Sequence, residues 1–295
     1  MFYRPRHRAG QKQRALWMHF LTAVIVLLVT VIVVYPFLEP LMLQTEYVTL
    51  TSPSLPREIG TLRIVYLSDI HYDYFFGMSR VKDLVSKVNA LNADIVLLGG
   101  DYAADSDGAI EFFRTAPQFN ARIAVCAVVG NHDRTLPESN LLVLQNAMRD
   151  AGVIPLVNDV AQVRFGAGSI YVAGIDDMNN GHPDLASVAA RVKSGDYVIF
   201  LAHSPAAIDA AARVDSADGM RTWYDLGLFG HTHGGQVALF GSLLNISDVP
   251  SRYESGWKIA NRTDVLISNG VGTSVLPIRI FRQPQIHVIT VKSGS

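Results

Sequence analysis

The segment Leu62-Arg-Ile-Val-Tyr-Leu-Ser-Asp-Ile-His71 decides the fold, because an apolar run ends there in two polar residues that are common metal ligands. The part from Leu62 to Leu67 is predicted to form a strand, since β-branched and aromatic residues favour strands. Side chains two positions apart on an extended chain share a face, so Asp69 and His71 are expected to point into one cavity. The segment therefore predicts a strand with a polar site at its carboxyl end.

The same pattern recurs along the chain. Further apolar runs end in Gly99-Gly-Asp101, Gly130-Asn-His-Asp133, Ala202-His203 and Gly230-His-Thr-His233. Helical spacing of apolar residues, as in Val81 to Leu91, occurs between the strands. This alternation predicts an α/β fold with mixed sheets and helices on the outside. Open α/β sheets usually build their sites at the carboxyl ends of strands, so these motifs are expected to meet.

The residue types in these motifs favour a pair of divalent metals. Carboxylates and imidazoles bind Mn, Fe or Zn, and an Asp can bridge two ions. Two ions about 3.5–4 Å apart can hold a hydroxide and both ends of an in-line phosphoryl displacement. Each motif alone is weak, because one His in an apolar strand is more often a core residue and Asn-His-Asp is more often a turn. Five of the nine histidines fall in these motifs, and together they predict a dinuclear metal site: 71, 132, 203, 231 and 233.

In this order the motifs resemble the calcineurin-like metallophosphoesterase family, over roughly residues 60–291. One departure is visible, since the family usually spaces its second motif Gly-Asp-x-x-Asp and Asp105 here lies one residue late. That puts a supporting role of Asp105 in doubt, but not the role of Asp101. The segments Gly230–Gln236, Ser268–Ser274 and Pro277–Ile280 resemble a bacterial membrane-associated branch. That branch includes enzymes that cleave the pyrophosphate of UDP-2,3-diacylglucosamine in lipid A biosynthesis.

The resemblance implies a two-sheet sandwich flanked by helices, with two divalent ions (Mn, Fe or Zn) as cofactors. It implies one ion held by Asp69, His71 and His233 and a second held by Asn131, His203 and His231, with Asp101 as the bridge. It further implies that His132 contacts the phosphate and stabilises charge or protonates the leaving oxygen. Asp133 would orient the His132 ring, as carboxylates commonly do for functional imidazoles.

The N-terminal part predicts a membrane anchor. Residues 15–35 carry no formal charge apart from His19, and about 20 apolar residues span a bilayer. A cleaved signal peptide would have an apolar region of about 7–15 residues that ends at small residues, whereas this run ends in Tyr35-Pro-Phe-Leu-Glu-Pro40. The predicted organisation is a basic cytoplasmic tail over 1–14, a transmembrane helix over 15–38 with the lipid bilayer as its partner, a linker over 39–60 and a hydrolase domain over 61–295.

The charge distribution predicts the topology. Five Lys or Arg residues precede the apolar run, and the next one is Arg57. Because positive charge is retained on the cytoplasmic side, we expect a single-pass protein of the cell (inner) membrane with a periplasmic or extracellular domain. This conflicts with the lipid A intermediate, which is made in the cytoplasm. A domain on the cytoplasmic face is therefore the alternative, with an apolar segment that enters the bilayer without crossing it.

The predicted function is hydrolysis of a phosphodiester or pyrophosphate bond by metal-activated hydroxide, on a phosphorylated small molecule or lipid. Nucleic acid is excluded as a partner, because the net charge is −1 and no basic patch with interleaved aromatic residues occurs. The single cysteine, Cys126, excludes an intrachain disulfide. Two alternatives are a broad-specificity exported phosphodiesterase or phosphomonoesterase and an inactive membrane-tethered binding protein with the same fold.

Overall fold

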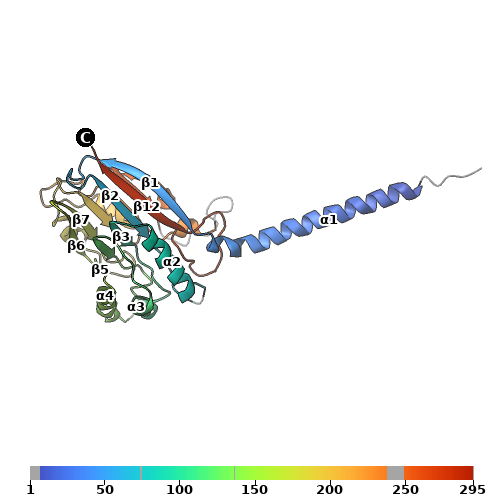
Figure 1. Cartoon of the computed structure of the whole chain (residues 1–295), viewed down its shortest axis with the longest axis horizontal. Coiled ribbons are helices and arrows are strands. Elements are labelled where there is room, and N and C mark those ends of the chain that lie inside the picture. The colour runs from blue at the N-terminus through green and yellow to red at the C-terminus, as the bar shows by residue number, and fades with distance from the viewer. Residues whose placement is uncertain (1–6, 74, 136, 238–248, 295) are drawn as a thin grey trace, which may run out of the picture.

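The protein consists of a long helix that stands out from a two-layered sandwich (Figure 1). The computed structural model describes residues 7–73, 75–135, 137–237 and 249–294. Within these residues, twelve strands form two six-stranded sheets. The two mixed sheets and their flanking helices confirm the predicted fold class.

The first sheet carries the chain's first three predicted motifs. Four neighbouring strands, from β2 to β5, run parallel, whereas β12 lies antiparallel to β2 and parallel to β1. In spatial order the sheet contains β1 (Gln44–Ser52), β12 (Gln285–Ser293), β2 (Thr61–Leu67), β3 (Ile95–Leu98), β4 (Ala124–Ala127) and β5 (Ile154–Pro155).

The second sheet has a parallel centre with an antiparallel strand at each edge. In spatial order it contains β10 (Gly256–Ala260), β11 (Thr263–Ile267), β9 (Leu226–Phe229), β8 (Val198–Leu201), β7 (Gly168–Gly174) and β6 (Asp159–Phe165). Its central strands β8 and β9 are buried along their whole length, as expected for strands covered on both faces.

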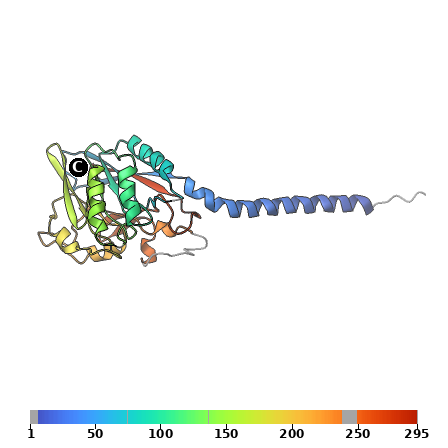
Figure 2. The same cartoon turned by 90° about the horizontal axis from the view of Figure 1, so that it is seen from below.

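The apolar core lies in three layers, because successive side chains of a strand point to opposite faces. Ile64 and Tyr66 of β2 pack between the two sheets, whereas Val65 and Leu67 pack outward under helices. That outer layer is covered by α2 (Met78–Ala90), α3 (Ser106–Thr115) and α4 (Asn140–Asp150), and Figure 2 shows α3 and α4 side by side. The second sheet is covered by the short helices α5 (Leu185–Ala189) and α6 (Ala206–Ala211).

The helix α1 (His7–Leu38) projects away from the sandwich, as Figures 1 and 2 both show. Within the described residues, the segment Gln13–Leu41 is long and apolar enough to cross a membrane, and few of its residues are buried. Large apolar side chains such as Leu16 and Ile32 are each 70% exposed. A continuous apolar surface of this kind is typical of contact with lipid. Residues 1–6 of the predicted basic tail lie outside the described part of the chain.

The structure corrects the predicted linker over 39–60. Glu39–Leu41 form a 3-10 turn, and Gln44–Ser52 form strand β1, which pairs with β12 in parallel along its whole length. The strand was missed because its side chains alternate only weakly between polar and apolar types. Two of them, Val48 and Leu50, nevertheless pack against the core between the sheets. Near the carboxyl end, an isolated bridge joins Ile280 to Val237.

Candidate active site

The predicted ligands come together where strands of both sheets end. Asp69 and His71 follow β2, Asp101 follows β3, and Asn131 follows β4. The second sheet supplies the rest: His203 follows β8, and His231 and His233 follow β9. A cavity of about 100 Å³ opens on four of them and is lined by Asp101, Asn131, His132, His231, Thr232, His233 and Ser274. The strand-end positions thus place donors from five separate motifs around one small cavity.

The first group of donors is Asp69, His71 and His233. The Nε2 atoms of His71 and His233 lie 3.1 Å apart, and His233 Nε2 lies 3.7 Å from Asp69 Oδ1. All three side chains are buried. Two imidazoles and a carboxylate at this spacing fit a divalent transition metal.

The second group is Asn131, His203 and His231. His203 Nε2 lies 3.2 Å from Asn131 Oδ1 and 3.3 Å from His231 Nδ1. His203 Nδ1 lies 2.8 Å from the carbonyl oxygen of Gly99. That hydrogen bond occupies Nδ1 and turns Nε2 toward the other donors, which is the usual way in which a ligating imidazole is oriented.

Asp101 lies between the two groups. One oxygen, Oδ2, is 3.6 Å from His71 Nε2 and 3.2 Å from His203 Nε2. The other oxygen, Oδ1, accepts a hydrogen bond from the backbone of His132 at 2.9 Å. One carboxylate oxygen therefore faces donors of both groups, which is the position of a bridging ligand.

The electrostatics of the described residues fit cations. Burial lowers the pKa of His71 and of His231 to about 4, which leaves both imidazoles neutral, the form that binds metals. Burial raises the pKa of Asp69 to about 6, because the carboxylate loses water and faces Asp101. For His203, burial alone would lower the pKa, but the charge of Asp101 raises it well above its usual value. The two buried carboxylates thus favour positive charge beside them, which a divalent ion supplies.

Glycines leave room for the carboxylates. A Cβ atom on Gly130 would overlap the carboxylate of Asp101, and one on Gly230 would overlap the carboxylate of Asp69. The predicted ligands also have an unusual backbone conformation, because five of them have φ between 48° and 70°: Asp69, His71, Asp101, His231 and His233. Residues with side chains rarely adopt this left-handed region, and such outliers cluster at functional sites.

His132 lies at the wall of the cavity and is half-buried. Its Nδ1 is 2.9 Å from the carbonyl oxygen of Ala104, and its ring meets the His71 ring edge-on at a centroid distance of 5.0 Å. The hydrogen bond at Nδ1 fixes the ring at the edge of the two groups above, and His132 also lies close enough to His71 and Asp101 to form a third candidate group of donors with them.

Asp133 has a different role from the one the resemblance implied. Its carboxylate accepts hydrogen bonds from the backbone N–H groups of Asp101 at 2.7 Å, Tyr102 at 3.0 Å and Gly130 at 2.8 Å. The ring of His132 is oriented by the Ala104 carbonyl instead. These three donors satisfy the buried carboxylate. Asp133 therefore connects the loop that contains Asp101 to the loop that contains Gly130 and Asn131.

Asp105 serves the fold. It is the N-cap of α3, where its Oδ1 accepts a hydrogen bond from the backbone of Gly108 at 2.8 Å. Its late spacing is explained by this capping role, since an Asp at an N-cap satisfies an N–H group of the first turn.

Several residues around the site were missed by sequence reasoning. Asn180 donates from Nδ2 to the carbonyl oxygen of Asn131 at 2.8 Å. Arg279 is fully buried, donates to the carbonyl oxygen of Asn269 at 2.7 Å and lies 3.4 Å from His233 Nδ1. Gln236, also buried, holds the loop that contains Ser274. The segments around Gln236 and Arg279 carried a resemblance, but no local pattern indicates contacts between residues so far apart in sequence.

Comparison with known proteins gives consistent results. The family model for calcineurin-like phosphoesterases matches residues 62–235. The uncharacterized metallophosphoesterase YkuE of Bacillus subtilis (strain 168) is 28% identical over 87% of this chain and 88% of its own length. The phosphodiesterase YaeI of Escherichia coli (strain K12) is 28% identical over 77% of this chain and 81% of its own length.

A further relative is named a transmembrane protein. The transmembrane protein with metallophosphoesterase domain of Danio rerio is 30% identical over 81% of this chain and 55% of its own length. The matched family region contains the seven predicted ligands, and it extends from the start of β2 to the residues after β9. The chain belongs to the calcineurin-like phosphoesterase family and is a metal-dependent hydrolase.

Proposed function

We propose that this protein is a membrane-anchored phosphoesterase that hydrolyses a phosphodiester or pyrophosphate bond with two divalent metal ions. The single observation that supports the dinuclear centre best is Asp101, whose Oδ2 faces His71 of one donor group and His203 of the other. Asp69, His71 and His233 would hold one ion, and Asn131, His203 and His231 the other.

The chain's own residues have defined tasks in such a reaction. Two bound ions supply an activated water and neutralise charge on the phosphoryl oxygens. His132 borders the cavity with its Nδ1 engaged by the Ala104 carbonyl. In its protonated form it would donate Nδ1–H to that carbonyl and Nε2–H to the leaving oxygen, which would then depart as a neutral alcohol or as a singly protonated phosphate anion.

Turnover of bis-p-nitrophenyl phosphate tests this function. We expect detergent-solubilised protein to hydrolyse it in the presence of Mn²⁺, to lose activity in a chelator and to regain it when Mn²⁺, Fe²⁺ or Zn²⁺ is restored. A chain that binds two ions but hydrolyses neither diesters nor pyrophosphates would instead be a tethered binding protein.

For the substrate, we propose a lipid-linked phosphodiester or pyrophosphate. If the domain faces the cytoplasm, this substrate is a lipid-linked nucleotide such as UDP-2,3-diacylglucosamine, from lipid A biosynthesis. The proposal is supported by the apolar helix beside the hydrolase fold and by the resemblance of residues 230–236 and 268–280. A broad-specificity exported phosphodiesterase is the second candidate, because the relative from Escherichia coli is named a phosphodiesterase and the five basic residues before the apolar run favour an exported domain. Equal or faster turnover of a soluble dinucleotide than of UDP-2,3-diacylglucosamine would favour the second candidate.

A further inference from the structure

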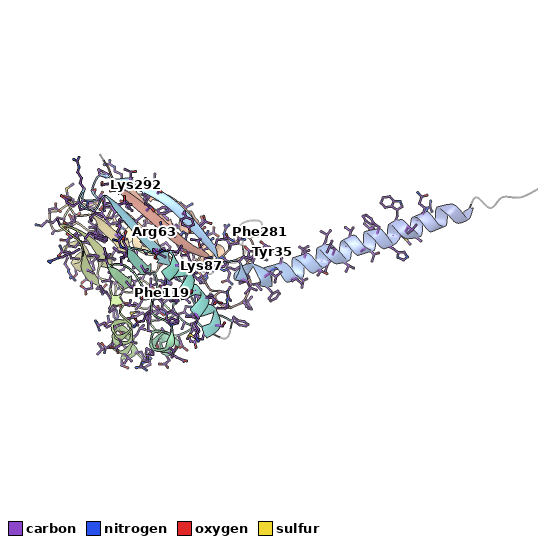
Figure 3. All side chains as sticks on the ribbon, viewed as in Figure 1. Tyr35, Arg63, Lys87, Phe119, Phe281 and Lys292 are labelled. Atoms are coloured by element: carbon purple, nitrogen blue, oxygen red, sulfur yellow. The ribbon has the colours of Figure 1, made fainter. Side chains whose placement is uncertain are left out.

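One loop joins the metal cavity to the foot of the membrane helix. Ser274 lines the cavity, and the chain then runs to Phe281. The backbone N–H of Arg279 donates to the carbonyl oxygen of Pro36 in α1 at 2.9 Å. The ring of Phe281 lies 6.0 Å from the ring of Tyr35, and Figure 3 shows the two side by side at the end of the helix. The loop of residues 274–281 therefore contacts the cavity at one end and the helix at the other.

A buried side chain holds this loop in place. Gln236 is 3% exposed and donates from Nε2 to the carbonyl oxygens of Ser274 at 3.0 Å and Leu276 at 3.1 Å. Its Oε1 accepts a hydrogen bond from the backbone of Ser274 at 2.9 Å, and its own carbonyl accepts one from Ile280 at 3.0 Å. Both ends of the loop are thus bound to one residue that follows His233 by three positions.

The helix end is bound to the same loop. Glu39, the residue after α1, is fully buried. Its carboxylate accepts hydrogen bonds from the backbone N–H groups of Phe281 at 2.8 Å and Arg282 at 2.6 Å. Because a buried carboxylate without these donors would be unfavourable, the contact fixes the loop relative to the helix. If α1 crosses a bilayer, the position of α1 in that bilayer therefore also fixes the distance of the loop from the membrane surface.

Apolar side chains are exposed around this junction. The exposed fraction is 80% for Val275, 49% for Leu276 and 62% for Phe281, and it is 62% for Leu41 and 39% for Met42 just after α1. Val275 and Phe281 also have φ of 63° and 57°, which is rare for a bulky side chain and rarer for a β-branched one. Single exposed apolar residues are normal on a protein surface. Here, however, five lie on the turn after the apolar helix and on the loop that contacts the end of that helix.

We propose that these five residues form an apolar rim that enters the interface of the same bilayer that α1 crosses: Leu41, Met42, Val275, Leu276 and Phe281. The occupant of this surface is the lipid bilayer, because Phe281 contacts Tyr35 of the apolar helix and Leu41 and Met42 follow that helix within a few residues. The metal cavity then opens next to the lipid headgroups. Resting on the proposed phosphoesterase function, the substrate is an amphiphile whose phosphate lies at that interface and whose acyl chains remain in the bilayer.

A fluorescent label tests the membrane contact. Val275→Cys is labelled with a nitrobenzoxadiazole maleimide in the full chain, reconstituted into phosphatidylcholine–phosphatidylglycerol vesicles. Cys126, the only native cysteine, is buried and stays unlabelled. The matched control is Ile259→Cys, because Ile259 is also 80% exposed. It pairs with Asp264, which lines a cavity with Ser52, at the end of β1 opposite to α1.

We expect blue-shifted emission and quenching by doxyl-labelled lipid at position 275, and water-like emission without quenching at position 259. Water-like emission at both positions would overturn the rim. Quenching at both would also overturn it, since contact would then not be confined to the rim.

A second experiment tests the class of substrate. The double variant Val275→Ser and Leu276→Ser is compared with Ile259→Ser on a diacylglyceryl p-nitrophenyl phosphate in vesicles and on soluble bis-p-nitrophenyl phosphate. We expect the rim variant to lose at least about tenfold in kcat/KM on the lipid ester, with turnover of the soluble ester unchanged. Unchanged rates on both esters would overturn the amphiphilic substrate. If the unaltered chain hydrolyses neither ester, the proposed function fails, and the labelling result alone decides the rim.

Discussion

Asp101 and His132 lie in one cavity but have different environments, and their variants are expected to separate metal binding from proton transfer. Asp101→Asn or His203→Ala should abolish turnover and lower the bound metal content, because a bridging carboxylate and an imidazole hold the ions. His132→Ala should retain both metals and lose about 10²–10⁴-fold in rate, the usual effect of a positioned acid or base. Metal analysis of the purified variants measures this, and loss of metal from His132→Ala would contradict the role we assign to it.

Asp133 acts through the backbone, so its variant should affect stability. Asp133→Asn keeps one accepting oxygen for three N–H donors, and we expect the free energy of unfolding to fall by about 1–3 kcal/mol, the cost of unsatisfied buried groups. Urea unfolding of the chelated protein in detergent gives the value. Asp105→Asn is the matched control, because Asn caps a helix about as well as Asp. An equal loss in both variants would refute the distinction.

Strand β1 is expected to be part of the domain. A chain that begins at Glu39 keeps β1 and the Glu39 carboxylate, whereas one that begins at Ser54 exposes β12 as an edge and uncovers the core beside Val48 and Leu50. We expect the shorter chain to be less stable by at least about 3 kcal/mol, from two half-buried side chains and a lost ladder. Thermal unfolding of the two truncated chains measures this difference in stability. Equal unfolding midpoints would mean that residues 39–53 are a linker and not part of the domain.

The sequence predicted the elements that are locally patterned. The ends of β2, β3, β4, β8 and β9 were recognisable because each apolar run stops at a ligand-type residue, and their parallel order then brings the ligands together. Strand β1 was missed because its Thr, Gln and Glu residues give little alternation. The contacts of Asp133, Gln236 and Arg279 were missed for a different reason. Each joins loops distant in sequence, and only the folded chain makes these hydrogen bonds visible.

At the scale of the whole molecule, the remaining prediction is the membrane topology, that is, the side of the membrane on which the domain lies. Five Lys or Arg residues precede the apolar run, and none occurs between Tyr35 and Pro56, so we predict an exported domain. The carboxyl end lies far from α1 (Figure 1), so a fusion after Ser295 leaves the helix end free. We expect an alkaline phosphatase fusion to be active and a green fluorescent protein fusion to be dark. The opposite pair would place the domain in the cytoplasm and revive the lipid A substrate.

The left-handed backbone at five ligand positions ties the lifetime of the protein to the metal supply of the cell. Such residues cost about 1–3 kcal/mol each, and two buried carboxylates lie among them, Asp69 and Asp101. Bound ions stabilise the folded chain by mass action. Without them, a loss of about 1–2 kcal/mol already changes the steady-state abundance of a protein several-fold through proteolysis. Immunoblots of cells starved of metal should therefore show less of this chain, with His132→Ala responding like the unaltered protein, whereas a constant level would mean that the scaffold holds the site open unaided.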